Sequence, residues 1–471
     1  MRMFTKENLL IFLWLCILFS INSIYIYYPP LQEITSFLTF SQKNIFALLN
    51  SIRFYFPFLL VPILIILFFS TKVKRPSLIV SLFFVYFCWQ LFAFFYSERF
   101  VKYSSNILSE KIHNTASLWD NLHLIFCSIS VLLVISIARN LDLKKFIKKI
   151  LIISLIFVGM IALYFTYSLM SESLVGDLQF IYKTATLDPS GSTLGQPNPR
   201  ITGVSRLILI FYFLVFSFLL NKNRKIVPCF ILIILGLIIY KMQTRGSFFG
   251  IFLVFILFFV FNSTPIKKKI IILTVVLLAP ILLFEAYYKI KYSELYAETT
   301  QTQTQTQNAP NRLATGTTSG RTQIWKNALS IINEKKIILG YGPQADRFLL
   351  TYFLPKHLKP DIYKLANGKI VIYDNNASNA ALYAYLCGGI LGFLLIISIY
   401  ILAIATVIKN IFIKKIFLRN NIFQTFSTIL LIYLGFRGLY ENSFSLFGVD
   451  YIFFILSYIM AENRVDLTKN I

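Results

Sequence analysis

The residues best suited to chemistry in this chain are arginines in loops between apolar segments. Six occupy such loops on one expected face: Arg200, Arg206, Arg245, Arg321, Arg347 and Arg437. A guanidinium donates two parallel hydrogen bonds to a phosphate and stays charged at any relevant pH. For any single arginine there, snorkelling to the interface or pairing with a lipid headgroup is the more common explanation. Arg245 fits this least, because Lys241–Ser247 is a very tight turn. A pyrophosphate-linked substrate would explain several of these arginines at once.

A long polar interval from about Lys289 to Asn379 carries the motifs that accompany these arginines. They are Gly320–Ile332, Leu339–Pro343, and Ser378-Asn379 leading into Gly389-Ile390-Leu391-Gly392. Apolar residues at helical spacing between Ile324 and Ile332 predict an amphipathic helix of about 15 residues against the membrane or the bundle. The tract Thr299–Gln307 has no apolar residue, so we expect a flexible linker without chemistry.

Composition indicates a polytopic membrane protein. Of 471 residues, 57% are hydrophobic and only 14% charged, and the mean hydropathy is +0.70, which argues against a soluble protein. The net charge of +25 comes mostly from short Lys and Arg clusters between apolar runs. This pattern reflects membrane topology and argues against a nucleic-acid partner.

Apolar runs predict an all-α helical bundle of about twelve transmembrane helices. They lie near 8–28, 54–70, 77–96, 119–138, 149–170, 206–221, 226–242, 247–262, 268–287, 380–407, 422–440 and 444–461. The first lacks a cleavage site and is expected to be a retained helix. The chain divides into spans one to nine (1–287), a large periplasmic loop (288–379), and spans ten to twelve with a tail (380–471).

Every second loop is basic, which predicts cytoplasmic termini and a periplasmic polar interval. The five cysteines and three histidines share no metal-ligand spacing, so we predict no disulfide, metal or cofactor. His113, His123 and His357 are interpreted as polar surface residues, with His357 a distant candidate base.

Four motifs resemble those of the O-antigen ligase and polymerase family. Thr244-Arg245-Gly246-Ser247 is similar to its Ser-Arg-Gly-type turn, and Arg200-Ile201-Thr202-Gly203 to its Arg-x-x-Gly loop. Arg321 with Trp325, followed by Gly340-Tyr341-Gly342, resembles the Arg-x-x-x-Trp helix and Gly-x-Gly turn. The span with Gly389 and Gly392 resembles the Gly-Leu-Leu-Gly helix. Their order on one expected face makes the resemblance fairly specific.

The resemblance implies an inverting, metal-independent glycosyltransferase in the bacterial inner membrane. Its donor would be an undecaprenyl-diphosphate-linked glycan, and its acceptor lipid A-core or another glycan. Motif matching assigns the diphosphate to Arg200, Arg245 and Arg321. Preorganised guanidiniums can stabilise a departing diphosphate without a metal.

One position departs from the family pattern. The family's general-base histidine falls on Ser378, with Asn379 after it, and a serine hydroxyl is a poor base near neutral pH. Asp374 or Glu441 takes that role, or the acceptor needs little activation, or the activity differs from that of the ligases. Glu441 is also a candidate ion-pair partner of Arg437.

Other functions remain open at the level of sequence. A repeat-unit polymerase would share the donor chemistry and differ in the acceptor. An anionic-solute transporter would be expected to show charges at mid-membrane and two related halves, and neither is evident. A structural or partner-binding membrane protein would leave the outer arginines without a reason.

Overall fold

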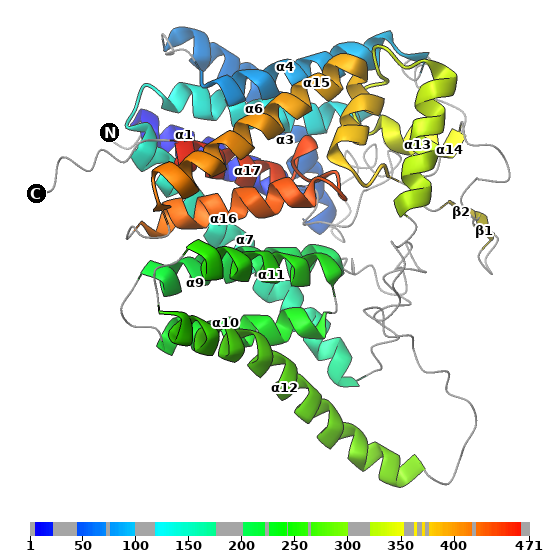
Figure 1. The fold of residues 1–471 in the computed structure, drawn as a ribbon. Helices are drawn as coiled ribbons and strands as arrows, with labels where there is room; N and C mark the ends of the chain where they lie inside the picture. Colours follow the sequence, from blue (N-terminus) through cyan, green and yellow to red (C-terminus); the bar gives the residue numbers. More distant parts are fainter. Residues whose placement is uncertain are drawn as a thin grey trace, which may run out of the picture.

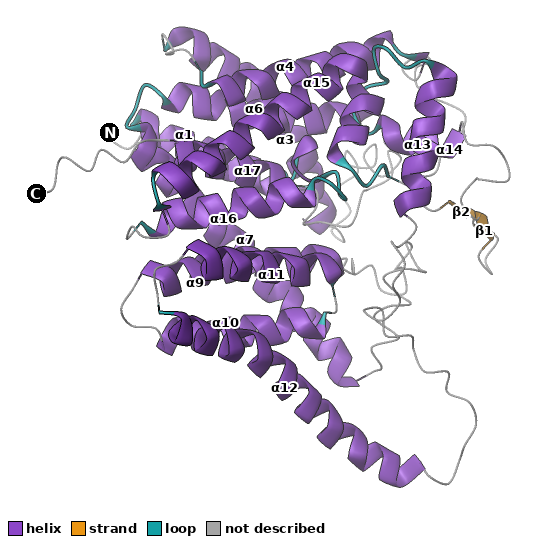
Figure 2. Cartoon of the chain, viewed as in Figure 1, coloured by secondary structure: helices purple, strands orange, loops and turns teal. Residues whose placement is uncertain are grey.

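Apolar segments with no water to bond their backbone must form helices, and helices make up nearly all of the described chain (Figures 1 and 2). The computed structural model describes residues 5–21, 45–71, 76–98, 118–175, 201–221, 226–242, 244–261, 265–299, 321–352, 362–364, 370–372, 376–416 and 421–462. The helices are α1 (Lys6–Phe19), α3 (Ile45–Ser70), α4 (Leu78–Tyr96), α6 (Leu118–Ala138), α7 (Leu143–Val175), α9 (Ile201–Asn221), α10 (Ile226–Lys241), α11 (Arg245–Phe261), α12 (Ile266–Thr299), α13 (Arg321–Lys335), α14 (Ala345–Tyr352), α15 (Ala380–Ile408), α16 (Ile422–Arg437) and α17 (Val449–Glu462), with short η4 (Lys409–Ile413) and η6 (Ser443–Ser445). The predicted all-α class is confirmed for the bulk of the fold.

Each predicted apolar segment contains a helix, but not every helix qualifies as a membrane span. Within the described residues, five helical stretches are long and apolar enough to cross a membrane: Leu78–Tyr96, Asn121–Ala138, Leu143–Leu163, Gly203–Leu220 and Ala380–Ile413. Five shorter apolar helices lie in α3, α10, α11, α12 and α16. An integral membrane protein is therefore supported, and the number of about twelve spans stays a prediction.

The helices form one bundle in which α16 packs against both α17 and α9 (Figure 1). Helices α4 and α15 cross one side of it, and α10 to α12 form the other. The centre is apolar and aromatic: Phe83 and Tyr451, for example, are fully buried with ring centroids 5.3 Å apart. The bundle thus provides a rigid base for the polar segments at its ends.

The basic ends of the helices lie together. Lys149 pairs with Glu7, and the Lys414 Nζ donates to the Ala461 carbonyl at 3.0 Å. Helices α13 and α14 lie at the opposite end of the bundle (Figure 1). The alternation of cytoplasmic and periplasmic loops, and which end faces the cytoplasm, stay predictions.

The polar interval contains more structure than predicted. Helix α13 has 15 residues, which confirms the predicted amphipathic helix, and α12 continues to Thr299. Strands β1 (Ile362–Lys364) and β2 (Ile370–Ile372) pair antiparallel. This hairpin was not predicted, although the β-branched run Ile370-Val371-Ile372 favours a strand. The tract after Thr299 lies outside the described residues.

Candidate functional site

Helix α15 is broken at Gly389, and the break receives the turn around Gly340–Gly342. Gly389 has φ 61° and ψ −152°, a region that only glycine adopts readily. The break releases backbone groups from the helical ladder, and each needs another partner. The carbonyls of Leu386 and Cys387 accept from Tyr341 N at 3.0 Å and from Gly342 N at 2.8 Å. The Gly388 carbonyl accepts from Trp89 Nε1 at 2.7 Å, and Ile390 N donates to the Ile338 carbonyl at 3.0 Å.

Glycine is required on both sides of this joint. A Cβ on Gly389 would lie 1.8 Å from the Ile338 carbonyl oxygen, and one on Gly340 would lie 2.5 Å from the Cys387 carbonyl. Gly340 also has φ 86°. The Gly-x-Gly turn and the Gly-x-x-Gly helix are therefore two halves of one structural joint.

The joint holds the outer helices against α15. Ala328 and Ile331 of α13 and Leu349 of α14 are buried in one apolar cluster with Tyr383 and Leu386 of α15. Burying such side chains contributes about 1.5–3 kcal/mol for each large aliphatic group. This packing fixes the start of α13, where Arg321 lies, relative to the start of α15, where Ser378 and Asn379 lie.

Asn379 caps α15. Its Oδ1 accepts from Ala381 N and Leu382 N, both at 2.9 Å, and its Nδ2 donates to the Leu439 carbonyl at 2.7 Å. Ala380 N donates to the Gly438 carbonyl at 2.8 Å. The first amides of α15 are thus occupied, which gives Asn379 a structural role at the site.

Ser378 lies directly before this cap in a strained conformation. Its φ is 46°, which is uncommon for a residue with a side chain. The Oγ donates to Asn376 Oδ1 at 2.6 Å, and the carbonyl accepts from Trp325 Nε1 at 3.2 Å. Trp325 therefore holds the backbone at Ser378, the position that motif matching assigned to the family's general base.

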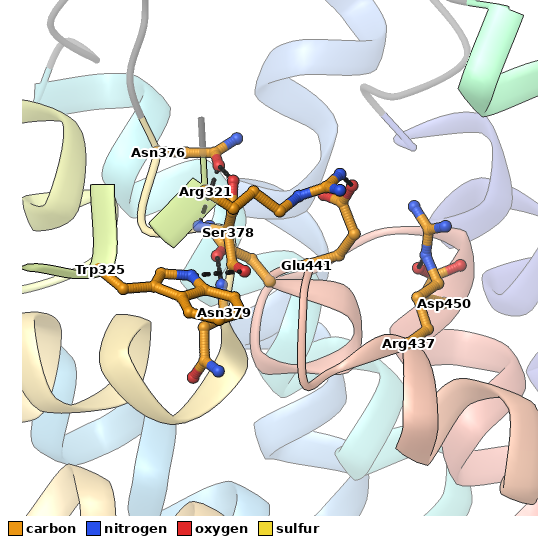
Figure 3. A network of polar contacts seen from close by, with 9 residues as sticks. Arg321, Trp325, Asn376, Ser378, Asn379, Arg437, Glu441 and Asp450 are labelled. Carbon is orange, nitrogen blue, oxygen red and sulfur yellow. Dashed lines mark hydrogen bonds and ion pairs between the residues drawn. The ribbon is translucent and has the colours of Figure 1, made fainter. Parts of the chain in front are cut away.

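Arg321 pairs with Glu441 beside Ser378 (Figure 3). Arg321 Nη2 donates to Glu441 Oε1 at 2.7 Å, and the guanidinium lies 5.8 Å from the centre of the Tyr440 ring. Burial raises the pKa of the Tyr440 phenol. The Arg321 and Glu441 side chains are 34% and 27% exposed, so a ligand can reach both. The suggested pairing of Glu441 with Arg437 is replaced by this one.

Arg437 and Arg206 instead share Asp450 in a buried triad. Asp450 Oδ2 accepts from Arg437 Nε at 3.0 Å and from Arg206 Nη1 at 3.2 Å, and Ser443 Oγ donates to it at 3.3 Å. Asp450 is 2% exposed. An ion pair buried this deeply loses much stability when one partner is removed. The triad therefore fixes the ends of α9, α16 and α17, and both arginines are engaged within the protein.

Sequence reasoning missed Asp450, although a signal was present. An acidic residue inside an apolar segment needs a cation or a cavity, and Asp450 lies in the predicted span 444–461. The described site contains three arginines (206, 321 and 437), two carboxylates paired with them (441 and 450) and the buried carboxylate of Asp346. These formal charges cancel (3 − 3 = 0), so the case for an anionic ligand rests on the reachable Arg321 guanidinium.

The remaining predicted site residues are only partly placed. Arg200 and Asp374 lie outside the described residues. Arg245 begins α11, but its side chain is not among those described. The turn before α11 is bonded to α9, since Thr244 Oγ1 donates to Ser205 Oγ at 2.8 Å. Arg321, Ser378, Asn379 and Glu441 are the predicted residues that the structure brings together (Figure 3).

The expectation that His123 lies on the surface was wrong. Its ring is fully buried, with Nε2 3.3 Å from the Ser20 carbonyl oxygen. Helix α6 is enclosed by neighbouring helices, and the end of α1 supplies the polar partner. His113 and His357 lie outside the described residues.

Comparison with known proteins gives one match. Residues 229–397 match the family model described as O-Antigen ligase, a stretch of about a third of the chain. It contains Arg245, Arg321, the Gly340–Gly342 turn, Ser378 and Gly389, whereas Glu441 and Asp450 follow it. No curated protein and no solved structure matches the chain. The family predicted from the motifs is thereby supported over residues 229–397.

Proposed function

We propose that this protein transfers a glycan from an undecaprenyl-diphosphate carrier to an acceptor hydroxyl at the periplasmic face of the bacterial inner membrane. The family match supports glycan transfer of the ligase or polymerase type. The observation that carries the proposal is the reachable Arg321–Glu441 pair beside Ser378, within and next to the matched domain.

The reaction requires little beyond placement and charge. The acceptor oxygen forms a bond to the anomeric carbon, the bond from that carbon to the diphosphate oxygen breaks, and the diphosphate leaves with the electron pair. Attack from the face opposite the leaving group inverts the anomeric centre. Guanidiniums aimed at the departing diphosphate stabilise its growing negative charge, and no metal is needed for this step.

Arg321 is the described residue best placed to bind the diphosphate. It is the first residue of α13, so the positive end of the helix dipole adds to its own charge. Arg245, whose turn is held to α9, and Arg200 are the further contacts proposed by motif matching. Arg206 and Arg437 contribute to the field and hold the scaffold.

Glu441 is the described carboxylate best placed to receive the acceptor's proton. An ion pair this exposed contributes only about 0–1 kcal/mol, so a diphosphate carrying several charges can replace Glu441 on Arg321. Donor binding would thereby free the carboxylate for the acceptor. Asp374 remains the alternative base, while Ser378 and Asn379 shape the acceptor side.

The acceptor would be lipid A-core for a ligase, which we place first, or a growing glycan for a polymerase. An anionic-solute transporter is supported less well. A discontinuous helix can expose backbone groups to a transported ion, but the groups released at Gly389 are bonded to the 338–342 turn and Trp89.

Substitution of Arg321 by Lys tests the proposal. The charge is kept but the two-pronged grip on phosphate is lost, so transfer of a labelled glycan in membrane vesicles should fall by roughly 10²- to 10³-fold. Arg139→Lys, at the basic end of the bundle, is the matched control and should transfer at the wild-type rate. Wild-type transfer by the Arg321 variant would refute its role, and an unchanged surface glycan in a deletion strain would refute the function.

A further inference from the structure

Asp346, in the first turn of α14, is a buried carboxylate between two segments of the site. It is 1% exposed, and its Oδ2 accepts from Ala377 N at 2.9 Å and from Asn442 Nδ2 at 3.2 Å. No cation among the described side chains forms an ion pair with it. A buried carboxylate is unfavourable unless donors surround it. These two hydrogen bonds therefore link α14 to the loop 376–379 and to the turn 438–442.

Asn442 continues the connection. Its Oδ1 accepts from Asn379 N at 3.3 Å. Asp346 and Asn442 thus bind the amides of Ala377 and Asn379, the two residues that flank Ser378. Asn442 also directly follows Glu441 in the chain.

The geometry of Ser378 shows what this connection does. A residue with a side chain at φ 46° is strained, and such a conformation persists only where the surroundings hold it. Bonds on both sides of Ser378 supply that restraint. Glu441 lies one residue from Asn442, so the same restraint fixes the turn that carries it.

We infer that Asp346 and Asn442 are positioning residues that clamp Ser378 in its strained conformation and set its separation from Glu441. The link to catalysis rests on the proposed function, whereas the clamp itself rests on geometry alone. Neither residue has to touch substrate, and at 1% exposure Asp346 is screened from it.

A different role for Asp346 would be to accept a proton. Its second oxygen, Oδ1, is buried with no hydrogen-bond partner within the described part of the chain. The two roles make opposite predictions for Asp346→Asn. The amide oxygen can still accept both hydrogen bonds of a clamp, but a carboxamide cannot serve as a base.

The test uses the full-length protein in lipid nanodiscs. Hydrogen–deuterium exchange of peptides covering residues 376–382 should become roughly five- to tenfold faster in Asp346→Ala and Asn442→Ala, because one hydrogen bond at each amide is lost. Asp346→Asn should stay close to wild type. Asn421→Ala removes a comparable side-chain hydrogen bond at the start of α16 and should leave this peptide unchanged.

Transfer kinetics separate a clamp from general loss of structure. In both alanine variants the rate at saturating donor should fall by roughly ten- to a hundredfold, the effect of a small misplacement. The donor concentration for half-maximal rate should change by less than about twofold. The double variant should be slower by less than the product of the two single effects, because Asp346 and Asn442 are hydrogen-bonded to each other and act on neighbouring amides.

Two results would overturn the inference. Unchanged exchange in Asp346→Ala would show that no clamp exists. An Asp346→Asn protein with wild-type exchange but no transfer would assign the carboxylate to proton transfer instead. Because exchange is measured without substrate, the clamp can be confirmed even if a deletion strain keeps its surface glycan, in which case only the proposed function fails.

Discussion

Gly389→Ala should release the outer segment from the bundle without unfolding the bundle. The added Cβ would lie 1.8 Å from the Ile338 carbonyl oxygen, and that oxygen is backbone, so it cannot swing aside. The alanine would also have to adopt φ 61° and ψ −152°. Either the turn 338–342 moves away or α15 straightens, and both outcomes break the joint.

The size of the effect follows from these contacts. Holding a residue other than glycine in this backbone region costs about 1–3 kcal/mol. The three backbone hydrogen bonds of the turn stabilise the docked state in both proteins, so they do not add to this difference. The strain alone shifts the docking equilibrium by about 1–3 kcal/mol, which is roughly five- to 150-fold.

Exchange of the Tyr341 and Gly342 amides measures this shift. We expect it to accelerate by roughly the same factor in Gly389→Ala, together with a loss of glycan transfer. Gly435→Ala in α16 is the matched control, because its Cβ would meet nothing within 4 Å and alanine favours a helix by about 0.5–1 kcal/mol. Wild-type exchange at Tyr341 in the Gly389 variant would refute the joint.

Three further substitutions test other parts of the account. Glu441→Gln should tighten binding of undecaprenyl diphosphate by at most about fivefold, because it removes a competing ion pair that contributes about 0–1 kcal/mol. The same substitution should abolish most glycan transfer, and unaltered transfer would exclude Glu441 as the base. Asp450→Ala should lower stability by about 3–5 kcal/mol by leaving buried guanidiniums unpaired. Asp142→Ala removes an exposed ion pair and the capping hydrogen bond from Lys145 N at the start of α7, so it should cost only about 0.5–2 kcal/mol. Thermal unfolding in detergent would detect equal losses if the triad is unimportant. Trp325→Phe should slow transfer by roughly two- to tenfold, because one hydrogen bond is lost. Trp14→Phe loses a similar hydrogen bond inside the bundle and should not slow transfer, so equal rates in the two variants would contradict the role of Trp325.

Local sequence pattern was sufficient to predict the helices and the amphipathic α13. Apolar length and periodicity report which segments become helical, and the 15 residues of α13 appeared at the predicted place. The motifs likewise identified the segments that meet at the site. The hairpin β1–β2 was missed because strands this short leave little periodicity to detect.

Partnerships between distant residues could not be predicted in the same way. The docking of Gly340–Gly342 onto Gly389 depends on how two segments pack, and either glycine motif alone indicates only a turn or a close approach. The pairing of Glu441 with Arg321 and of Arg437 with Asp450 depends on the bundle geometry. Burial of His123 followed from the central place of α6, which hydropathy does not report.

The most direct test of the central claim is a structure of the full-length protein with undecaprenyl diphosphate in a lipid nanodisc. The account predicts phosphate oxygens within hydrogen-bond distance of the Arg321 guanidinium, with Glu441 displaced from it and facing Ser378. A diphosphate bound elsewhere, with the Arg321–Glu441 pair intact at its present 2.7 Å, would contradict it.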